Sequence, residues 1–335
     1  MEQSKLPMIE LHLHLDGAIP PETMWALAQE KGVPMPAETL EGFQHWLVET
    51  SDCADVNTYL ARFELPLQLM QDAPSIARVT KDLMTELSRQ GHIYDEIRFA
   101  PQLHRREGLM QRQAIEAVLE GRRQALAENP GYDAGILLCA MCIGPETVNM
   151  AENLETVRLA KEFLGRGVVG ADLAGAEGIV PLQSFHPVFD LAVPATCHAG
   201  DSQGPDTVRD ALSFGVRRIG HGHHIYDEPS LWEPAIARGV TLEICPTSNI
   251  QCHTQPSYRE HPATKLLDAG LRLCISTDNM TLAAVSLADE YRHCVEDMGL
   301  TPEDLGKMLV FAAEAAFLPE EKKQKLVARV REALS

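Results

Sequence analysis

The sequence of 335 residues predicts an α/β fold, specifically a (β/α)8 barrel. Two observations favour it. Short apolar segments alternate about eight times with helical patterns, as in parallel strands joined by helices. Polar residues follow the ends of these segments, where barrel enzymes carry their active sites. An open, doubly wound sheet is the alternative, but its usual glycine-rich phosphate loop does not follow the first strand. Because barrels of this length often form one domain, residues 1–335 are predicted to be a single domain.

The first strand is predicted at residues 8–16, where aliphatic and polar side chains alternate with a period of two. The aliphatic side chains lie on one face, and His12, His14 and the following Asp16 lie on the other. Two histidines at positions i and i+2 point the same way and can share one metal ion. Since neutral imidazole is a common zinc ligand, this strand predicts part of a metal site. The alternative is a strand whose polar face meets solvent.

The other elements follow from apolar runs, helical periodicity and breaking residues. The remaining strands are predicted at residues 94–101, 134–141, 168–175, 195–200, 217–222, 240–245 and 271–278. Helices are predicted at residues 23–32, 76–90, 114–127, 146–164, 185–191, 207–214, 229–238 and 262–269, with further helices toward the C-terminus. Residues 33–75 are interpreted as extra helices inserted after the first strand, either a lid or a packing insertion without a gating role.

Bulk composition excludes several classes of function. The net charge of −19 disfavours nucleic acid and anionic membranes as partners. No apolar stretch reaches the roughly 18 residues of a membrane span, and no signal-peptide pattern is present. The eight scattered cysteines are typical of reduced, buried thiols, so we expect a cytoplasmic protein. Cys139 and Cys142 form a C-x-x-C pattern that we interpret as core packing. No protein partner is indicated.

Three histidines and one aspartate at strand ends predict one metal site: His12 and His14, then His198, then Asp278. Nitrogen and oxygen ligands without thiolate favour zinc, with iron, cobalt and manganese left open. Each residue alone has a simpler interpretation, such as a helix N-cap for Asp278, but their joint placement favours metal ligands. The other histidines divide into two groups: His104, His186, His253 and His261 are interpreted as structural or surface residues, and His223 and His224 are left undecided.

An ordered set of motifs resembles the adenosine deaminase family of metal-dependent hydrolases. The motifs are Ile-Glu-Leu-His-Leu-His-Leu-Asp-Gly17, Arg-Phe-Ala-Pro-Gln-Leu-His104, Asp-Leu-Ala-Gly175, Cys-His-Ala-Gly-Asp201, Arg-Ile-Gly-His-Gly222, Leu-Glu-Ile-Cys-Pro-Thr-Ser-Asn249 and Ser-Thr-Asp278. The resemblance implies a barrel that uses one zinc ion per chain to remove the 6-amino group of adenosine or deoxyadenosine. It assigns the ligands named above. The absence of lysine between residues 168 and 178 agrees with a single metal.

The resemblance also implies how the purine is held. Four residues would contact the substrate: His14, Asp16, Gly175 and Asn279. The Gly175 amide would contact N3 of the base, and Asp16 would accept a hydrogen bond from the ribose. Asn279 stands where an aspartate is more familiar; its amide can donate to N7 without being protonated.

Two residues would perform catalysis. His221 would hold and polarise the attacking water or act as its base. Asp201 stands where the family has a glutamate that protonates N1, and its carboxyl lies roughly 1.5 Å further back; a misplacement of ~1 Å can cost on the order of 100-fold in rate. Three hypotheses follow: an adenosine deaminase, a deaminase of adenine or a modified adenine nucleoside, or a non-catalytic purine-binding relative. The motifs of zinc-dependent nucleic-acid deaminases and of serine hydrolases are absent.

Overall fold

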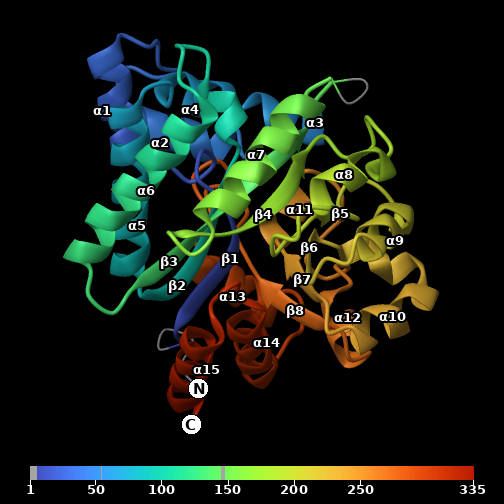
Figure 1. The fold of residues 1–335 in the computed structure, drawn as a ribbon. Helices are drawn as coiled ribbons and strands as arrows, with labels where there is room; N and C mark the ends of the chain where they lie inside the picture. Colours follow the sequence, from blue (N-terminus) through green and yellow to red (C-terminus); the bar gives the residue numbers. More distant parts are fainter. Residues whose placement is uncertain (1–5, 54, 145–147) are drawn as a thin grey trace.

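The computed structural model describes residues 6–53, 55–144 and 148–335, and in these ranges a ring of parallel strands forms the centre (Figure 1). The strands are β1 (Met8–His14), β2 (His92–Phe99), β3 (Asp133–Cys142), β4 (Val168–Gly175), β5 (His198–Ala199), β6 (Arg218–His221), β7 (Thr241–Ile244) and β8 (Arg272–Ile275). They pair in order as β1-β2-β3-β4 and β5-β6-β7-β8. Parallel bridges at Leu13–Asp278 and Ala171–Ala195 join these two sets into a barrel. The predicted barrel is confirmed.

Helices follow the strands around the outside of the barrel. They are α5 (Ala73–Gln90), α6 (Gln111–Glu128), α7 (Met150–Phe163), α8 (His186–Phe189), α9 (Pro205–Ser213), α10 (Trp232–Ala237), α11 (Pro246–Gln251) and α12 (Ala263–Asp268). The predicted first residue of α7, Glu146, lies outside the described residues. Strand β5 is shorter than predicted, because residues before it touch β4 at a single bridge and Gly200 turns the chain with a φ of 65°.

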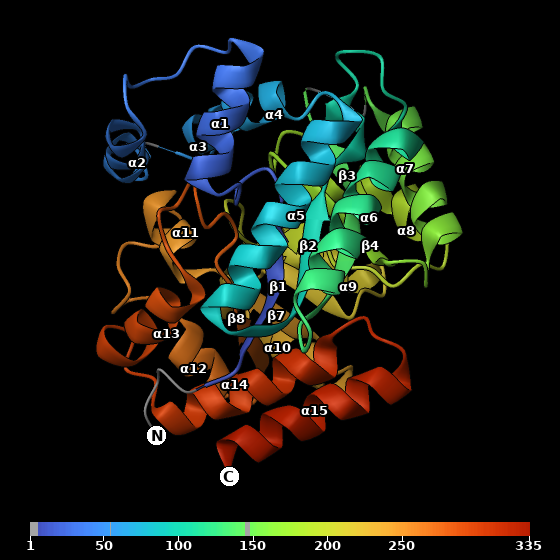
Figure 2. The ribbon, with the colours of Figure 1, turned by 90° about the vertical axis from the view of Figure 1, so that its left-hand side faces the viewer.

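The extra helices predicted after the first strand and toward the C-terminus are present, and they cover the two ends of the barrel (Figure 2). Helices α1 (Pro21–Lys31), α2 (Leu40–Glu49), α3 (Val56–Ala61) and α4 (Glu64–Leu69) lie at the end where the strands terminate. Helices α14 (Pro302–Ala315) and α15 (Glu320–Leu334) lie at the opposite end, and α13 (Leu287–Glu296) precedes them. None of the helices in the described part of the chain has both the length and the apolar character to cross a bilayer.

Strand β1 occupies the middle of this architecture. Its aliphatic side chains, Ile9, Leu11 and Leu13, are at most 1% exposed, because helices such as α13 and α14 pack against the strand. The alternate side chains, Glu10 and His12, are also fully buried and face the barrel interior. The interpretation of a polar face in solvent is therefore wrong.

Candidate active site

Four predicted metal ligands converge at the carboxyl ends of β1, β5 and β8. One ligand atom each of His12, His14, His198 and Asp278 lies within 4.8 Å of all the others. His14 Nε2 is 3.2 Å from His198 Nε2, and Asp278 Oδ1 is 3.4 Å from Nε2 of both His12 and His14. Donors ~2.1 Å from a shared ion in tetrahedral geometry lie about 3.4 Å apart. Buried His12 Nε2 has no hydrogen-bond partner among the described residues, so the donor set fits a metal ion.

The backbone fixes this arrangement where β1 meets the segment after β8. His14 N donates to Asp278 O (2.8 Å), and Asp278 N donates to His12 O (2.9 Å). Asp278 has a left-handed φ of 64°, and its Oδ2 accepts from Ser248 Oγ at 2.7 Å, which leaves Oδ1 for the metal position. Gly220 has no side chain, and a Cβ there would lie 2.9 Å from the His12 ring. Glycine at this position therefore leaves room for the ligand.

Two buried carboxylates contact the Nδ1 atoms of two of the predicted histidine ligands. Glu243 Oε2 is 2.8 Å from His12 Nδ1, and Asp172 Oδ2 is 3.1 Å from His198 Nδ1. Such partners fix the tautomer and leave Nε2 free to bind metal. Arg98 contacts both carboxylates, at 2.7 Å to Asp172 and 2.8 Å to Glu243. Burial alone would raise the pKa of Asp172, but His198 and Arg98 outweigh it and lower that pKa.

These roles of Asp172, Glu243 and Arg98 were not predicted from the sequence. A signal was present for Asp172 and Glu243, because each is a charged residue inside an otherwise apolar strand, and a buried charge needs a partner. Arg218, on β6, extends the network, with Nε 2.7 Å from Glu243 Oε1. The sequence could indicate that these charges pair, but the barrel register decides which pairs form.

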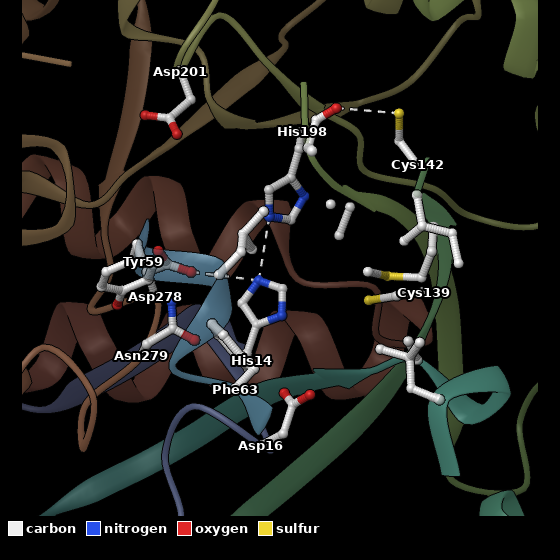
Figure 3. Close-up of a pocket in the computed structure, with 18 of the residues that line it drawn as sticks. His14, Asp16, Tyr59, Phe63, Cys139, Cys142, His198, Asp201, Asp278 and Asn279 are labelled. Carbon is white, nitrogen blue, oxygen red and sulfur yellow. Dashed lines mark hydrogen bonds and ion pairs between the residues drawn. The ribbon is translucent and has the colours of Figure 1, made fainter. Parts of the chain in front are cut away.

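A cavity of about 350 Å³ opens beside the metal ligands (Figure 3). It includes every predicted substrate and catalytic residue: His14, Asp16, Gly175, Asn279, Asp201 and His221. Most of the remaining wall is apolar, with Tyr59, Leu60, Phe63 and Leu67 from the inserted helices and Leu103 and Met141 from the barrel. Figure 3 shows Asp16 and Asp201 on opposite sides of the His14–His198 pair. A ligand in the cavity would therefore meet one carboxyl group at each end.

The two predicted catalytic side chains are adjacent. His221 Nδ1 lies 3.6 Å from Asp201 Oδ1. Burial and the neighbouring His12 lower the pKa of His221 to about 3, so it is neutral at pH 7. Burial and the negative charge of Asp278 raise the pKa of Asp201 to about 6. Asp201 therefore protonates more readily than an exposed aspartate.

Glu177 holds the loop that carries Asp201. Its Oε1 accepts from Gly200 N at 2.6 Å. Its Oε2 accepts from the amides of Asp201, Ser202 and Gln203 at 3.1, 2.8 and 3.0 Å. The sequence alone does not predict this role, because no local pattern connects Glu177 with a loop more than 20 residues away.

The other histidines considered above and the two cysteines of the C-x-x-C pattern belong to neither of the possible metal-binding groups among the described residues. His104 Nδ1 contacts Met70 O at 2.9 Å, and His224 Nδ1 contacts Asp227 Oδ2 at 2.6 Å. His186 and His253 are exposed and His223 is buried. Cys139 and Cys142 are free and buried, which agrees with core packing, and they also line the cavity. His261 is buried, and its Nε2 lies 3.2 Å from Asn249 Oδ1.

Comparison with known proteins identifies the family. The family model described as adenosine deaminase matches residues 7–333. The chain belongs to the adenosine deaminase family. An adenosine deaminase of Haemophilus ducreyi is 38% identical, covering 97% of this chain and 96% of the relative. The chain is therefore a hydrolytic deaminase of a metal-dependent family, and its group of three histidines and one aspartate could hold a metal ion.

Solved structures agree with the barrel. An Arabidopsis N6-mAMP deaminase is 28% identical with a TM-score of 0.83, covering 99% of this chain and 100% of that one. An adenine deaminase from Arthrobacter aurescens is 21% identical with a TM-score of 0.87, covering 98% and 99% of the two chains. The second likeness shows the fold alone. Because the names of these deaminases differ, the substrate has to be inferred from the cavity of this chain.

Proposed function

We propose that this enzyme converts adenosine or deoxyadenosine to inosine or deoxyinosine and ammonia, using one zinc ion held by His12, His14, His198 and Asp278. The observation that carries the proposal is the cavity beside these ligands, with an acidic side chain at either end and apolar walls between (Figure 3). The all-nitrogen-and-oxygen donor set suits zinc. When bound, such a metal makes water a sufficiently strong nucleophile at neutral pH.

The residues of this chain supply binding and proton handling. Asp201, whose pKa is raised to about 6, can hold the proton that N1 of the purine must gain when oxygen adds at C6. His221 lies next to Asp201 and also lines the cavity, where it would contact the oxygen that adds at C6. The Gly175 amide and the Asn279 side chain would hold N3 and N7. These contacts orient C6 toward the metal ligands.

Charge favours a nucleoside over a nucleotide. None of the described residues that line the cavity is lysine or arginine, so a buried phosphate would have no cationic partner. At the end opposite Asp201, the buried Oδ1 of Asp16 has no hydrogen-bond partner among the described residues. A ribose hydroxyl that donates a hydrogen bond to this oxygen would supply the missing partner. Adenine alone would leave it unpaired, which disfavours the free base.

An N6-modified adenine nucleoside is the second candidate. Asp201 is one methylene shorter than glutamate, which leaves space beside the 6-position. A second cavity meets the first at Ala176, Asp201 and Cys252. A substituent on N6 could extend into this second cavity, and the name of the Arabidopsis relative is consistent with such a substrate.

A substrate panel tests these alternatives by ammonia release from the zinc-loaded enzyme. The panel comprises adenosine, deoxyadenosine, N6-methyladenosine, adenine and AMP, with methylamine measured for the N6-methyl compound. We expect kcat/KM for AMP to be at least about 100-fold below that for adenosine. The phosphate of AMP would lose its hydration in the cavity, where no cationic side chain would replace the lost interactions with water. A best kcat/KM for N6-methyladenosine or adenine would replace the primary proposal. No turnover of any member would support the non-catalytic alternative.

We further propose that the enzyme works in the cytoplasm. All eight cysteines are free and buried, and none of them is paired in a disulfide that an oxidising compartment would maintain.

A further inference from the structure

One side-chain amide, that of Asn249 in α11, contacts both catalytic candidates. Its Nδ2 lies 2.8 Å from Asp201 Oδ1 and 3.1 Å from His221 Nδ1. Its Oδ1 lies 3.2 Å from His261 Nε2. Asn249, His261 and His221 are all at most 3% exposed, so these contacts are sheltered from water.

The orientation of this amide follows from both of its ends. The peptide N–H of Ala263 can only donate, and it lies 3.2 Å from His261 Nδ1. His261 Nδ1 is therefore an acceptor, and the ring proton is on Nε2, which donates to Asn249 Oδ1. At the other end, Asp201 needs a donor, which is the NH2 group of Asn249. Both requirements specify the same orientation.

The same amide determines which nitrogen of His221 carries a proton. One Nδ2 hydrogen of Asn249 is directed to Asp201 and the other to His221 Nδ1, so this nitrogen accepts. In the opposite tautomer, Nδ1–H would have to donate to Asp201 Oδ1 at 3.6 Å, beyond hydrogen-bond distance, while facing the hydrogens of Asn249. The contacts select the tautomer with the proton on Nε2, the nitrogen left for the cavity.

We propose that Asn249, oriented by His261, is a positioning residue that keeps His221 as an Nε2–H donor toward the substrate and holds Oδ1 of Asp201, leaving Oδ2 for N1 of the purine. This inference rests on the proposed deamination. His221 then donates a hydrogen bond to the oxygen that attacks C6 and does not take a proton from it. Thr254 Oγ1, 3.1 Å from Asp201 Oδ1, supports the same carboxyl oxygen.

A spectroscopic test measures the tautomer directly. The zinc-loaded enzyme is labelled with 15N-histidine, and long-range 1H–15N correlations are recorded for its 13 histidines. The His221 signals are identified by their loss in His221→Asn. We expect an unprotonated Nδ1 and a protonated Nε2 in the otherwise unmodified protein. A protonated Nδ1 would overturn the proposal. Because no substrate is present, this result does not depend on which purine the enzyme deaminates, or on whether it does so.

A kinetic test uses two matched pairs of side chains. Asn249→Asp keeps the shape but removes both donated hydrogens; it should move the His221 proton to Nδ1 and lower kcat about 100-fold, as for a catalytic group displaced by ~1 Å. KM should change less than about threefold, because Asn249 does not line the cavity. His261→Gln keeps a donor near the position of Nε2, whereas His261→Asn does not reach it.

We expect His261→Gln to retain kcat within about fivefold, and His261→Asn to lose about 30-fold or more, with zinc content and melting temperature unchanged in both. Equal kcat values for these two variants, or a normal kcat in Asn249→Asp, would refute a positioning role. Loss of zinc or of folded structure in both His261 variants would instead assign His261 a purely structural role, which also refutes it.

Discussion

Replacing Glu177 should slow deamination although its side chain does not line the cavity beside the metal ligands. Its carboxylate accepts from the amides of residues 200–203, the loop that carries Asp201. In Glu177→Gln, the remaining oxygen can keep three of these bonds, and Gly200 N retains Thr207 Oγ1 at 2.9 Å. A hydrogen bond to a charged acceptor stabilises by about 1 kcal/mol more than one to a neutral acceptor. Because the loop is partly exposed, we expect the substitution to reduce the stabilisation of the loop by about 2 kcal/mol in total.

A free-energy difference of about 2 kcal/mol corresponds to a roughly 30-fold lower population of the correctly placed loop. We therefore expect kcat to fall about 10- to 30-fold in Glu177→Gln, and about 100-fold in Glu177→Ala, where all four bonds are lost. The assay is ammonia release under saturating adenosine, with KM and zinc content measured in parallel. Glu233→Gln, at an exposed position on α10, is the matched control and should match the unmodified enzyme. If Glu177→Ala keeps kcat within about threefold, the loop does not need this carboxylate.

Four further results are expected. Asp201→Asn should keep zinc and fold but lose about 10²- to 10⁴-fold in kcat, and a smaller loss would show that another group protonates N1. Glu243→Gln removes a charged partner of His12 and Arg98, so zinc affinity measured against a chelating dye should fall about 10- to 100-fold; unchanged affinity would contradict that role. Chelation should lower the melting temperature by several degrees, since a ligand at ~1,000 times its Kd contributes about 4 kcal/mol, and an equal melting temperature with and without zinc would exclude a site built from these ligands. Burial raises the pKa of Glu290 from 4.5 to about 8, so between these values the folded chain holds a proton that the unfolded chain releases, and stability falls as pH rises by up to about 1.4 kcal/mol per unit. Glu290→Gln should therefore melt higher than the unmodified protein above pH 8 and equally near pH 4.5, and a constant difference would contradict the assignment.

The barrel was predictable because its signals are local. Alternating apolar and polar residues marked β1, and short apolar runs with glycine or proline between them marked the other strands. The short β5 was harder, because its extent depends on how far residues 195–197 pair with β4, which is a contact between distant segments.

The convergence of the four predicted metal ligands could also be expected from the sequence, since each stands near the end of a strand and parallel strands of a barrel end on one face. Asp172, Glu177, Glu243 and Asn249 were not assigned roles, because their partners are fixed by the three-dimensional register. His261 shows the limit most clearly. Nothing near it in the sequence distinguishes it from a surface histidine, and its relation to His221 passes through Asn249 from another part of the chain.

The junction between the first strand and the segment after the last one holds three of the four proposed metal ligands, and this has a consequence for biosynthesis. The backbones of His12 and Asp278 are hydrogen-bonded, yet the two residues lie 266 positions apart in the sequence (278 − 12). A ribosome that has made only the first three quarters of the polypeptide has not yet produced the last ligand. A metal ion held by all four residues could therefore be bound only late in synthesis, and it would then link an early part of the chain to a late one.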